Sequence, residues 1–214
     1  MIDKAKLGFW ELFTYFLIGL LITIFFIIYT TRVDLIALDE ILRILKDCGA
    51  LGVVLFPIIF LILGLLFEPI GNFSFKYLER ISYFKPRESR GVAALEPVII
   101  KYLPAGLGNR QAFRYCKAVV EQNFPNSNIS VFLARFGFYR GLGILMIMLC
   151  VVDLILIDWD LYSALQSFIY LSLSIVFIKR AQSFKGHMEY ETYYNFIAYK
   201  ENVKFKGIYF QSTP

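Results

Sequence analysis

Long runs of apolar residues dominate the hydrophobic pattern of the chain. Two runs contain 20 uncharged residues each and a third contains 18, while another run of 17 residues is interrupted only by Asp153. A helix needs about 20 mostly apolar residues to cross about 30 Å of hydrocarbon. The pattern therefore predicts four membrane-spanning helices, at 12–31, 48–67, 141–157 and 161–178.

The polar stretches between these runs also contain helical patterns. Apolar residues at 73, 77, 78, 81 and 84 predict an amphipathic helix that leaves the second span along the membrane surface. Asn109 is the expected N-cap of a helix that ends near Asn123. Another helix is expected to begin at Ile129 and to continue into the third span, and the fourth span continues without a breaker toward Tyr199.

These elements predict an all-α, polytopic membrane protein with a small helical cytoplasmic domain. The first run is too long for a signal-peptide core of roughly 7–15 residues, and no small-residue cleavage site follows it. The expected parts are a transmembrane hairpin (1–68), a cytoplasmic helical segment (69–128), a second transmembrane hairpin with long helix extensions (129–200) and a tail (201–214).

Composition and charge support this organisation and give it an orientation. Hydrophobic residues make up 58% of the 214 residues and charged ones 18%, with a mean hydropathy of +0.61. Such values exclude a purely soluble or disordered chain. The termini and the segment between the second and third spans carry 19 basic and 10 acidic residues, against 3 and 7 for the remainder. Because Lys and Arg are retained inside, both termini are expected to be cytoplasmic.

Side chains suited to catalysis or metal binding are scarce. His187 is the one histidine, and the sequence has no HExxH, GxSxG or complete P-loop motif. The three cysteines, Cys48, Cys116 and Cys150, have neither CxxC nor paired spacing. We therefore expect no enzymatic activity, no metal and no cofactor.

Polar residues recur along the fourth span at helical spacing. This polar stripe has two interpretations: hydrogen bonding and close packing between helices, or the lining of a pore. It consists of Ser163, Ser167, Tyr170 and Ser174, with Gln166 nearby.

Two acidic residues lie in or beside the spans. Asp153 is close to the short connection between the third and fourth spans, so we expect its side chain to reach the outer surface, with a proton relay as the alternative. Glu68 is expected to reach the cytoplasmic interface beside Pro69.

Basic residues gather at the cytoplasmic ends of the third and fourth spans and in the central segment. Lipid headgroups and the retention of positive charge explain such a rim, and a phosphate-bearing ligand is the alternative. The candidate ligand-binding residues are Arg87, Arg90, Arg110, Arg114, Lys117, Arg135, Arg140, Lys179 and Arg180.

Three aromatic and basic segments carry a resemblance to known proteins. They are AFRYCKAVVEQNFP at 112–125, FLARFGFYR at 132–140 and FIKRAQSFK at 177–185. The chain from about residue 70 to 200 resembles small four-span proteins of the bacterial inner membrane. Some of these look like membrane effectors of anti-phage defence, including the Hailong type, in which a nucleotide or oligonucleotide made by a partner nucleotidyltransferase controls an oligomeric membrane protein.

The resemblance implies a homo-oligomeric, ligand-gated pore or ion channel that acts in abortive infection. A nucleotide-like ligand would bind the cytoplasmic basic surface, and reading of duplex DNA is not expected. The alternative is a non-conducting membrane anchor that recruits a cytosolic defence partner through residues 70–128.

Overall fold

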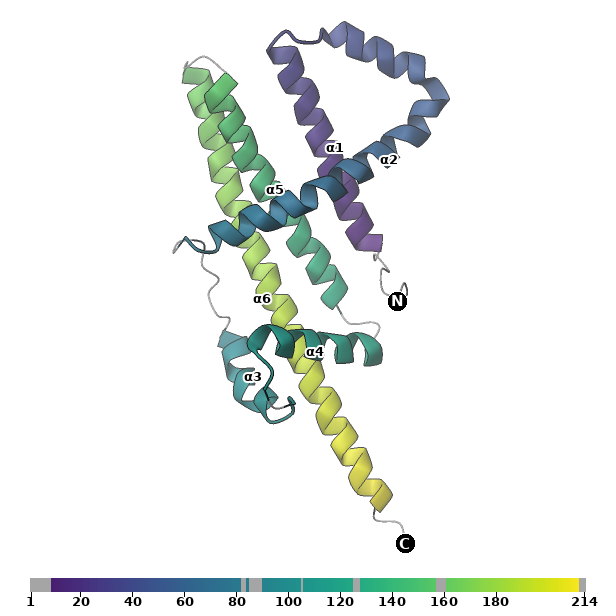
Figure 1. Cartoon of the computed structure of the whole chain (residues 1–214), viewed down its shortest axis with the longest axis vertical. Coiled ribbons are helices and arrows are strands. Elements are labelled where there is room, and N and C mark those ends of the chain that lie inside the picture. The colour runs from purple at the N-terminus through teal and green to yellow at the C-terminus, as the bar shows by residue number, and fades with distance from the viewer. Residues whose placement is uncertain are drawn as a thin grey trace. The chain divides into compact units, whose positions relative to one another are not determined.

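A computed structural model describes residues 9–81, 84, 90–104, 106–124, 128–156 and 161–211. In these ranges it contains helices and no strand, and four of the helices are long and apolar enough to cross a membrane. The predicted all-α fold with four spanning helices is confirmed. The helices are α1 (Phe9–Arg32), α2 (Leu38–Leu78), α3 (Arg90–Ile100), α4 (Asn109–Asn123), α5 (Ile129–Leu156) and α6 (Leu161–Gln211) (Figure 1).

The spanning helices are longer than the apolar runs that predicted them. The second run ends at a charged residue, but α2 continues through Glu68 and Pro69 to Leu78. A proline inside a membrane helix is tolerated because neighbouring groups compensate for its missing N–H. The amphipathic helix predicted over 73–84 is shorter than expected, since residues 73–78 form the last turns of α2 and the helix ends there. Glu79 is the C-cap.

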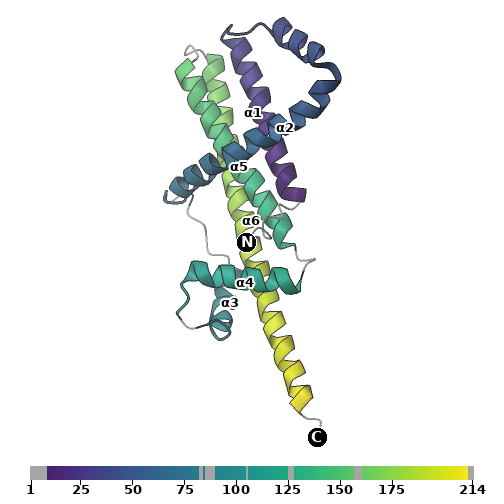
Figure 2. The same ribbon diagram turned by 45° about the vertical axis from the view of Figure 1, so that its right-hand side comes forward.

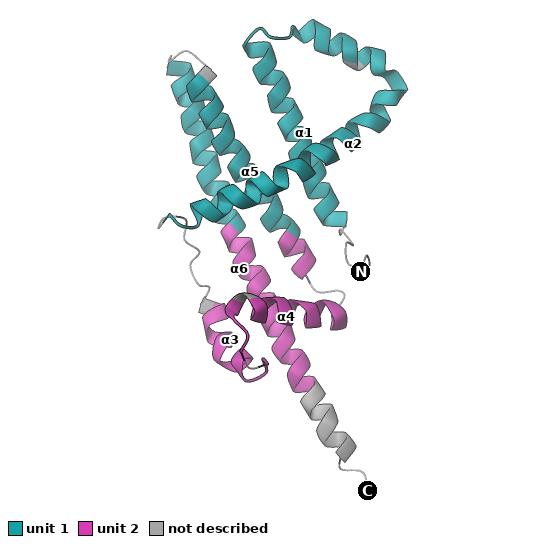
Figure 3. Cartoon of the chain, in the orientation of Figure 1, with its two compact units in different colours: residues 1–85, 134–181 teal, residues 86–133, 182–214 magenta. Residues whose placement is uncertain are grey.

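The chain divides into two compact units (Figure 3). Unit 1 comprises residues 1–85 and 134–181, and unit 2 comprises residues 86–133 and 182–214. Both α5 and α6 contribute residues to each unit. The units are described separately below.

Helix α5 is the central helix of unit 1. Every residue from Gly141 to Met146 is buried. In the most apolar stretch of α5 half of the residues are buried, against 17–22% in the corresponding stretches of the other three spanning helices. A Cβ atom at Gly141 would lie 2.9 Å from Ile18 of α1, and one at Gly143 would lie 2.7 Å from Ile178 of α6. Residues two apart point to opposite sides of a helix. These two glycines therefore let α1 and α6 approach α5 from opposite sides.

Helices α1 and α2 cross at a second pair of glycines (Figure 2). A Cβ atom at Gly19 would overlap the carbonyl of Phe60, and one at Gly64 would overlap the carbonyl of Tyr15. Direct contact between helix backbones is the packing that small residues permit in membranes.

Gly49 bends α2 sharply. Its φ of 48° and ψ of −134° are not helical, and Figure 1 shows the segment before it turned away from the rest of α2. A positive φ is readily adopted by glycine and disfavoured in residues with a Cβ atom. The charged first turns of α2 are thus separated from its apolar part, which begins near Lys46.

Unit 2 has its own apolar core, formed by α3, α4, the start of α5 and the later part of α6. Its buried members are Ile99, Cys116, Val120, Ile129, Met188 and Phe196. The predicted N-cap of α4 is wrong by one residue. Gly108 is the N-cap, and its backbone N–H donates a hydrogen bond to the side-chain oxygen of Gln111. Asn109 is the first residue of the helix.

Candidate functional site

A cluster of polar side chains surrounds Asp153 inside unit 1. Asp153 is 1% exposed, so the expectation that its side chain reaches the surface is wrong. The hydroxyl of Tyr29 donates a hydrogen bond to Asp153 Oδ1. Arg32 Nη1 lies 4.0 Å from the same oxygen, and the Arg32 side chain is 29% exposed. Tyr29 and Arg32 are three residues apart on α1 and therefore share one face of that helix.

Helix α6 completes this cluster. Arg32 Nη1 donates a hydrogen bond to Gln166 Oε1 at 2.8 Å, and Gln166 Nε2 donates one to the hydroxyl of Tyr170 at 2.9 Å. Gln166 and Tyr170 are four residues apart and lie on one face of α6. We call the five residues Tyr29, Arg32, Asp153, Gln166 and Tyr170 the Asp153 cluster. It links α1, α5 and α6.

The carboxylate of Asp153 is only partly compensated. Its Oδ2 atom is buried and has no hydrogen-bond partner among the described residues. An ionised carboxylate can accept about four hydrogen bonds, and burying a charge is costly unless it is paired and hydrogen-bonded. The cluster therefore holds a buried carboxyl group opposite a partly exposed guanidinium group, close to the end of α5.

A second polar cluster lies further along α5. Arg140 Nη2 is 3.8 Å from Glu68 Oε1 of α2, and the guanidinium carbon of Arg140 lies 5.0 Å from the centre of the Phe136 ring. Tyr15 of α1 lies close to Glu68 and interacts with it electrostatically. The side chain of Arg140 is 12% exposed and that of Glu68 is 33% exposed. These four residues, the Arg140 cluster, link α1, α2 and α5.

The two clusters are separated by apolar packing. Arg140 and Asp153 are 13 residues apart in one helix, which corresponds to about 20 Å along its axis. Between them lie the tightly buried residues 141–146. Unit 1 therefore has two buried polar layers inside an otherwise apolar bundle, and each layer joins three helices.

The predicted polar stripe of the fourth span is located on the packed side of α6. Ser163, Ser167 and Ser174 are 6%, 8% and 1% exposed, and Tyr170 is half-buried. A Cβ atom added at Gly143 of α5 would lie 3.4 Å from the carbonyl oxygen of Ser174. The stripe therefore contacts helices of the same chain in this conformation.

The predicted ligand-binding residues are distributed over both units. In unit 1, Arg135, Lys179 and Arg180 are exposed, whereas Arg140 belongs to the buried cluster and a ligand would have to displace Glu68 to reach it. In unit 2, Arg114 is exposed, and Lys117 Nζ lies 3.5 Å from Glu121. Arg87 lies outside the described residues, as do the side chains of Arg90 and Arg110.

Sequence reasoning missed Tyr29 and Arg32. Both stand at the end of the first apolar run, where Arg32 was counted only as its flanking charge. The available signal was their spacing of three residues, which places both polar side chains on one face of the first span. This spacing points to Asp153 only once α1 is known to pack beside it.

The fold and the two buried polar clusters define a multi-pass helical membrane protein. No protein-family model, curated protein or solved structure matches the chain. Across the part of the chain that the structure describes, no three His, Cys, Asp or Glu side chains come together as a metal site would require.

Proposed function

We propose that the protein is an oligomeric pore of the bacterial inner membrane that acts in anti-phage defence and is controlled by a nucleotide-like ligand. The observation that supports conduction best is the Asp153 cluster. Ionisable groups inside membrane helices are costly and are most often kept where ions or protons pass or where a charge controls a conformational change. The resemblance of residues 70–200 to defence effectors supports the biological role.

Conduction requires a change from the conformation described above. The hydroxyl stripe is packed against helices of the same chain, so it lines a path only after α6 moves away from α5. Such a movement would break the hydrogen bond between Arg32 and Gln166, which joins α1 to α6. The Asp153 cluster would then hold the closed state, and several copies would surround the open path.

Helix α6 offers a connection between ligand binding and the membrane. It carries Gln166 and Tyr170 of the Asp153 cluster, and it also carries Met188 and Phe196 of the unit 2 core. A ligand that changes the packing of α6 within unit 2 would thus act on the same helix that closes unit 1. Exposed basic side chains, such as Arg114 in unit 2, would supply the attraction for phosphate.

The proposal is tested by recording the membrane potential of bacteria that express the chain, with and without phage. We expect depolarisation that Ser167→Leu alters, because this buried hydroxyl lies on the packed face of α6. Ser172→Ala is the matched control, since the half-buried Ser172 hydroxyl donates a hydrogen bond to the carbonyl of Phe168 within the same helix. An unchanged potential in protected cells would instead favour the non-conducting anchor.

A further inference from the structure

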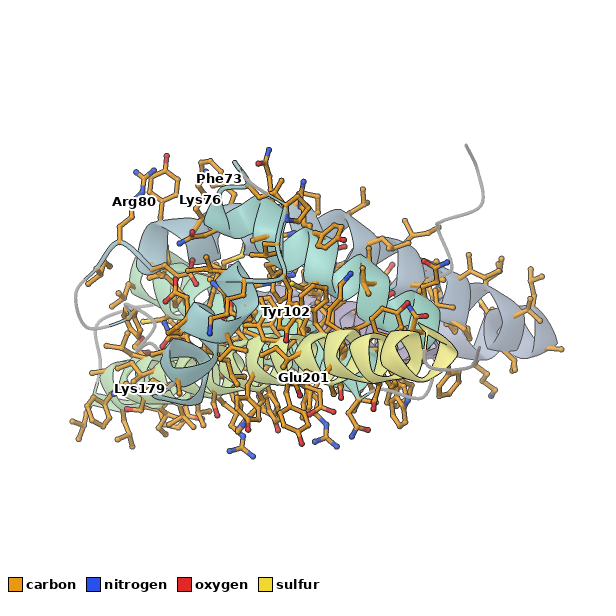
Figure 4. All side chains as sticks on the ribbon, turned by 90° about the horizontal axis from the view of Figure 1, so that it is seen from below. Phe73, Lys76, Arg80, Tyr102, Lys179 and Glu201 are labelled. Atoms are coloured by element: carbon orange, nitrogen blue, oxygen red, sulfur yellow. The ribbon has the colours of Figure 1, made fainter. Side chains whose placement is uncertain are left out.

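The last turns of α2 present an exposed surface that the proposed pore does not use. Phe73, Tyr77 and Ile81 are 64%, 51% and 51% exposed, although all three are large apolar or aromatic residues. Lys76 and Arg80 are exposed beside them. Figure 4 shows the labelled side chains of Phe73, Lys76 and Arg80 together on one side of unit 1 and directed away from the ribbon. We call these five residues the α2 end surface.

The side chains of this surface are arranged in two adjacent rows. Phe73 and Tyr77 are four residues apart on α2, and Ile81 follows after the same interval in the turn beyond the helix. Lys76 and Arg80 have the same spacing, with Lys76 in the helix and Arg80 in the turn. The opposite side of the same turns is packed, because Phe75 is 5% exposed and contacts the ring of Phe136. The end of α2 therefore has apolar residues on two sides, and only the side that carries Phe75 is covered by unit 1.

Contacts within the surface hold its cationic group in place. The rings of Phe73 and Tyr77 have their centres 4.8 Å apart, and the guanidinium carbon of Arg80 lies 4.9 Å from the centre of the Tyr77 ring. Arg80 thus stacks on an aromatic face, which orients its planar group and leaves its N–H donors directed outward. Glu79 is half-buried, whereas Lys76 and Arg80 are exposed.

From these observations we infer that the α2 end surface binds anionic phospholipids, with Arg80 and Lys76 on the headgroup phosphate and the aromatic rings at the boundary of the acyl chains. The surface continues an apolar helix that is long enough to span a membrane, and aromatic and basic residues are enriched at that level of a bilayer. Its positive charge is complementary to a negatively charged lipid. A soluble ligand would use the cations but would leave Phe73 and Ile81 exposed to water.

The inference goes beyond the proposed function and does not depend on it, because lipid binding is measurable in a chain that conducts no ions. It also differs from the predicted basic rim. The candidate residues of that rim begin at Arg87, whereas the α2 end surface combines two cations with three apolar side chains from the last turns of α2 and the residues directly after it.

Binding is tested with the purified full chain in vesicles that contain spin-labelled phosphatidylglycerol or spin-labelled phosphatidylcholine. The motionally restricted fraction of each lipid gives their relative association with the protein. Near an anionic membrane each basic residue contributes about five-fold to association. The double variant Lys76→Gln/Arg80→Gln should therefore lower the preference for phosphatidylglycerol several-fold, with about thirty-fold as the upper bound at low salt.

A matched control removes the same number of positive charges at another place on α2. Arg43→Gln/Lys46→Gln removes two exposed basic residues from the first part of the same helix, before the bend at Gly49, and should leave the preference unchanged. Tyr77→Leu removes the ring beneath Arg80 and should weaken the preference without changing the charge. Equal lipid preference in the Lys76/Arg80 variant and its control would overturn the inference.

A second measurement reports directly on what touches the surface. With Trp10 and Trp159 replaced by Phe, a Phe73→Trp variant has a single tryptophan at the α2 end surface. We expect its fluorescence to be quenched by lipids brominated near the headgroup. An absence of quenching would show that water or protein covers the surface, and would overturn the inference.

The size of the oligomer is a further readout. If the Lys76/Arg80 variant changes in oligomer size while its lipid preference stays intact, the surface makes contact between copies of the chain, and the inference is overturned.

Discussion

The ion pair between Glu68 and Arg140 offers a quantitative test of the buried polar layers. Their charged atoms are 3.8 Å apart. At that separation two unit charges attract by about 1 kcal/mol in water and by about 4 kcal/mol at an effective dielectric constant of about 20. One-third of the Glu68 side chain is exposed, which screens the pair and places the expected coupling energy near the lower value, at about 1–2 kcal/mol.

A double-mutant cycle with Glu68→Gln and Arg140→Gln measures this coupling. The free energy of unfolding is obtained for each variant by denaturant titration in detergent micelles. Glu68→Gln should be strongly destabilising, because it leaves the nearly buried Arg140 without an anion. The double variant should lose less stability than the sum of the two single losses, by about 1–2 kcal/mol.

The control for this cycle is Arg135→Gln, which removes an exposed cation from the same helix. It should change stability by less than about 0.5 kcal/mol and should show no coupling to Glu68→Gln. Additive effects of Glu68→Gln and Arg140→Gln, within about 0.5 kcal/mol, would refute the view that this layer holds α2 against α5.

Four further predictions concern packing, reactivity and pH dependence. Gly64→Ala should separate α1 from α2, since the added Cβ would overlap the Tyr15 carbonyl. Gly71→Ala is the control and should be tolerated, because its Cβ would lie 4.0 Å from the Phe67 ring. The yield of engineered cross-links between α1 and α2 should fall in the Gly64 variant and stay unchanged in the Gly71 variant. Asp153→Leu should lower the thermal stability of unit 1 more than Asp39→Leu does at an exposed site, because it leaves the Tyr29 hydroxyl without its acceptor and Arg32 without its anion. Burial raises the pKa of the Cys116 thiol from 9.0 to about 11, so maleimide should label the half-buried Cys48 before Cys116, and mass spectrometry of the labelled peptides checks the order. The raised pKa also means that the native state holds this proton more tightly, so the contribution of Cys116 to the stability of unit 2 should be complete below pH 9 and should be lost as the pH rises toward 11. Thermal melts of the full chain at increasing pH, followed by circular dichroism, would measure this loss.

The spanning helices could be predicted because their signal is local. An apolar run of sufficient length is enough to identify a membrane helix, and α1 and α6 begin near the predicted positions. The end of α2 could not be found in the same way. Glu68 and Pro69 resemble a helix boundary when read alone, but Glu68 is paired with Arg140 of α5, 72 positions later in the sequence. That partner makes the charge tolerable inside the helix.

The same reason explains the error at Asp153. An acidic residue near the end of an apolar run is usually expected to extend to the surface. Its actual partners are Tyr29 and Arg32, which precede it by more than 120 positions, and no local pattern connects them. The polar stripe on α6 was visible in the sequence as a periodicity, whereas the helices against which it packs were not.

Both buried layers involve α1 and α5, and they differ in the third helix. The Arg140 cluster includes α2 and the Asp153 cluster includes α6. A movement of α6 can therefore break the Asp153 cluster while the Arg140 cluster continues to hold α1, α2 and α5 together. This arrangement suits a membrane protein in which one helix moves against a stable group of three.

Ion flux through the purified chain tests the proposed pore most directly. The protein would be reconstituted in planar lipid bilayers, with short single-stranded oligonucleotides and the common ribonucleoside triphosphates as probes on the side of unit 2. We predict currents that at least one of these probes increases, and that Gln166→Leu increases without any probe because it removes the link from Arg32 to α6. An absence of current under all of these conditions, from protein that protects cells against phage, would contradict the account and identify a non-conducting anchor.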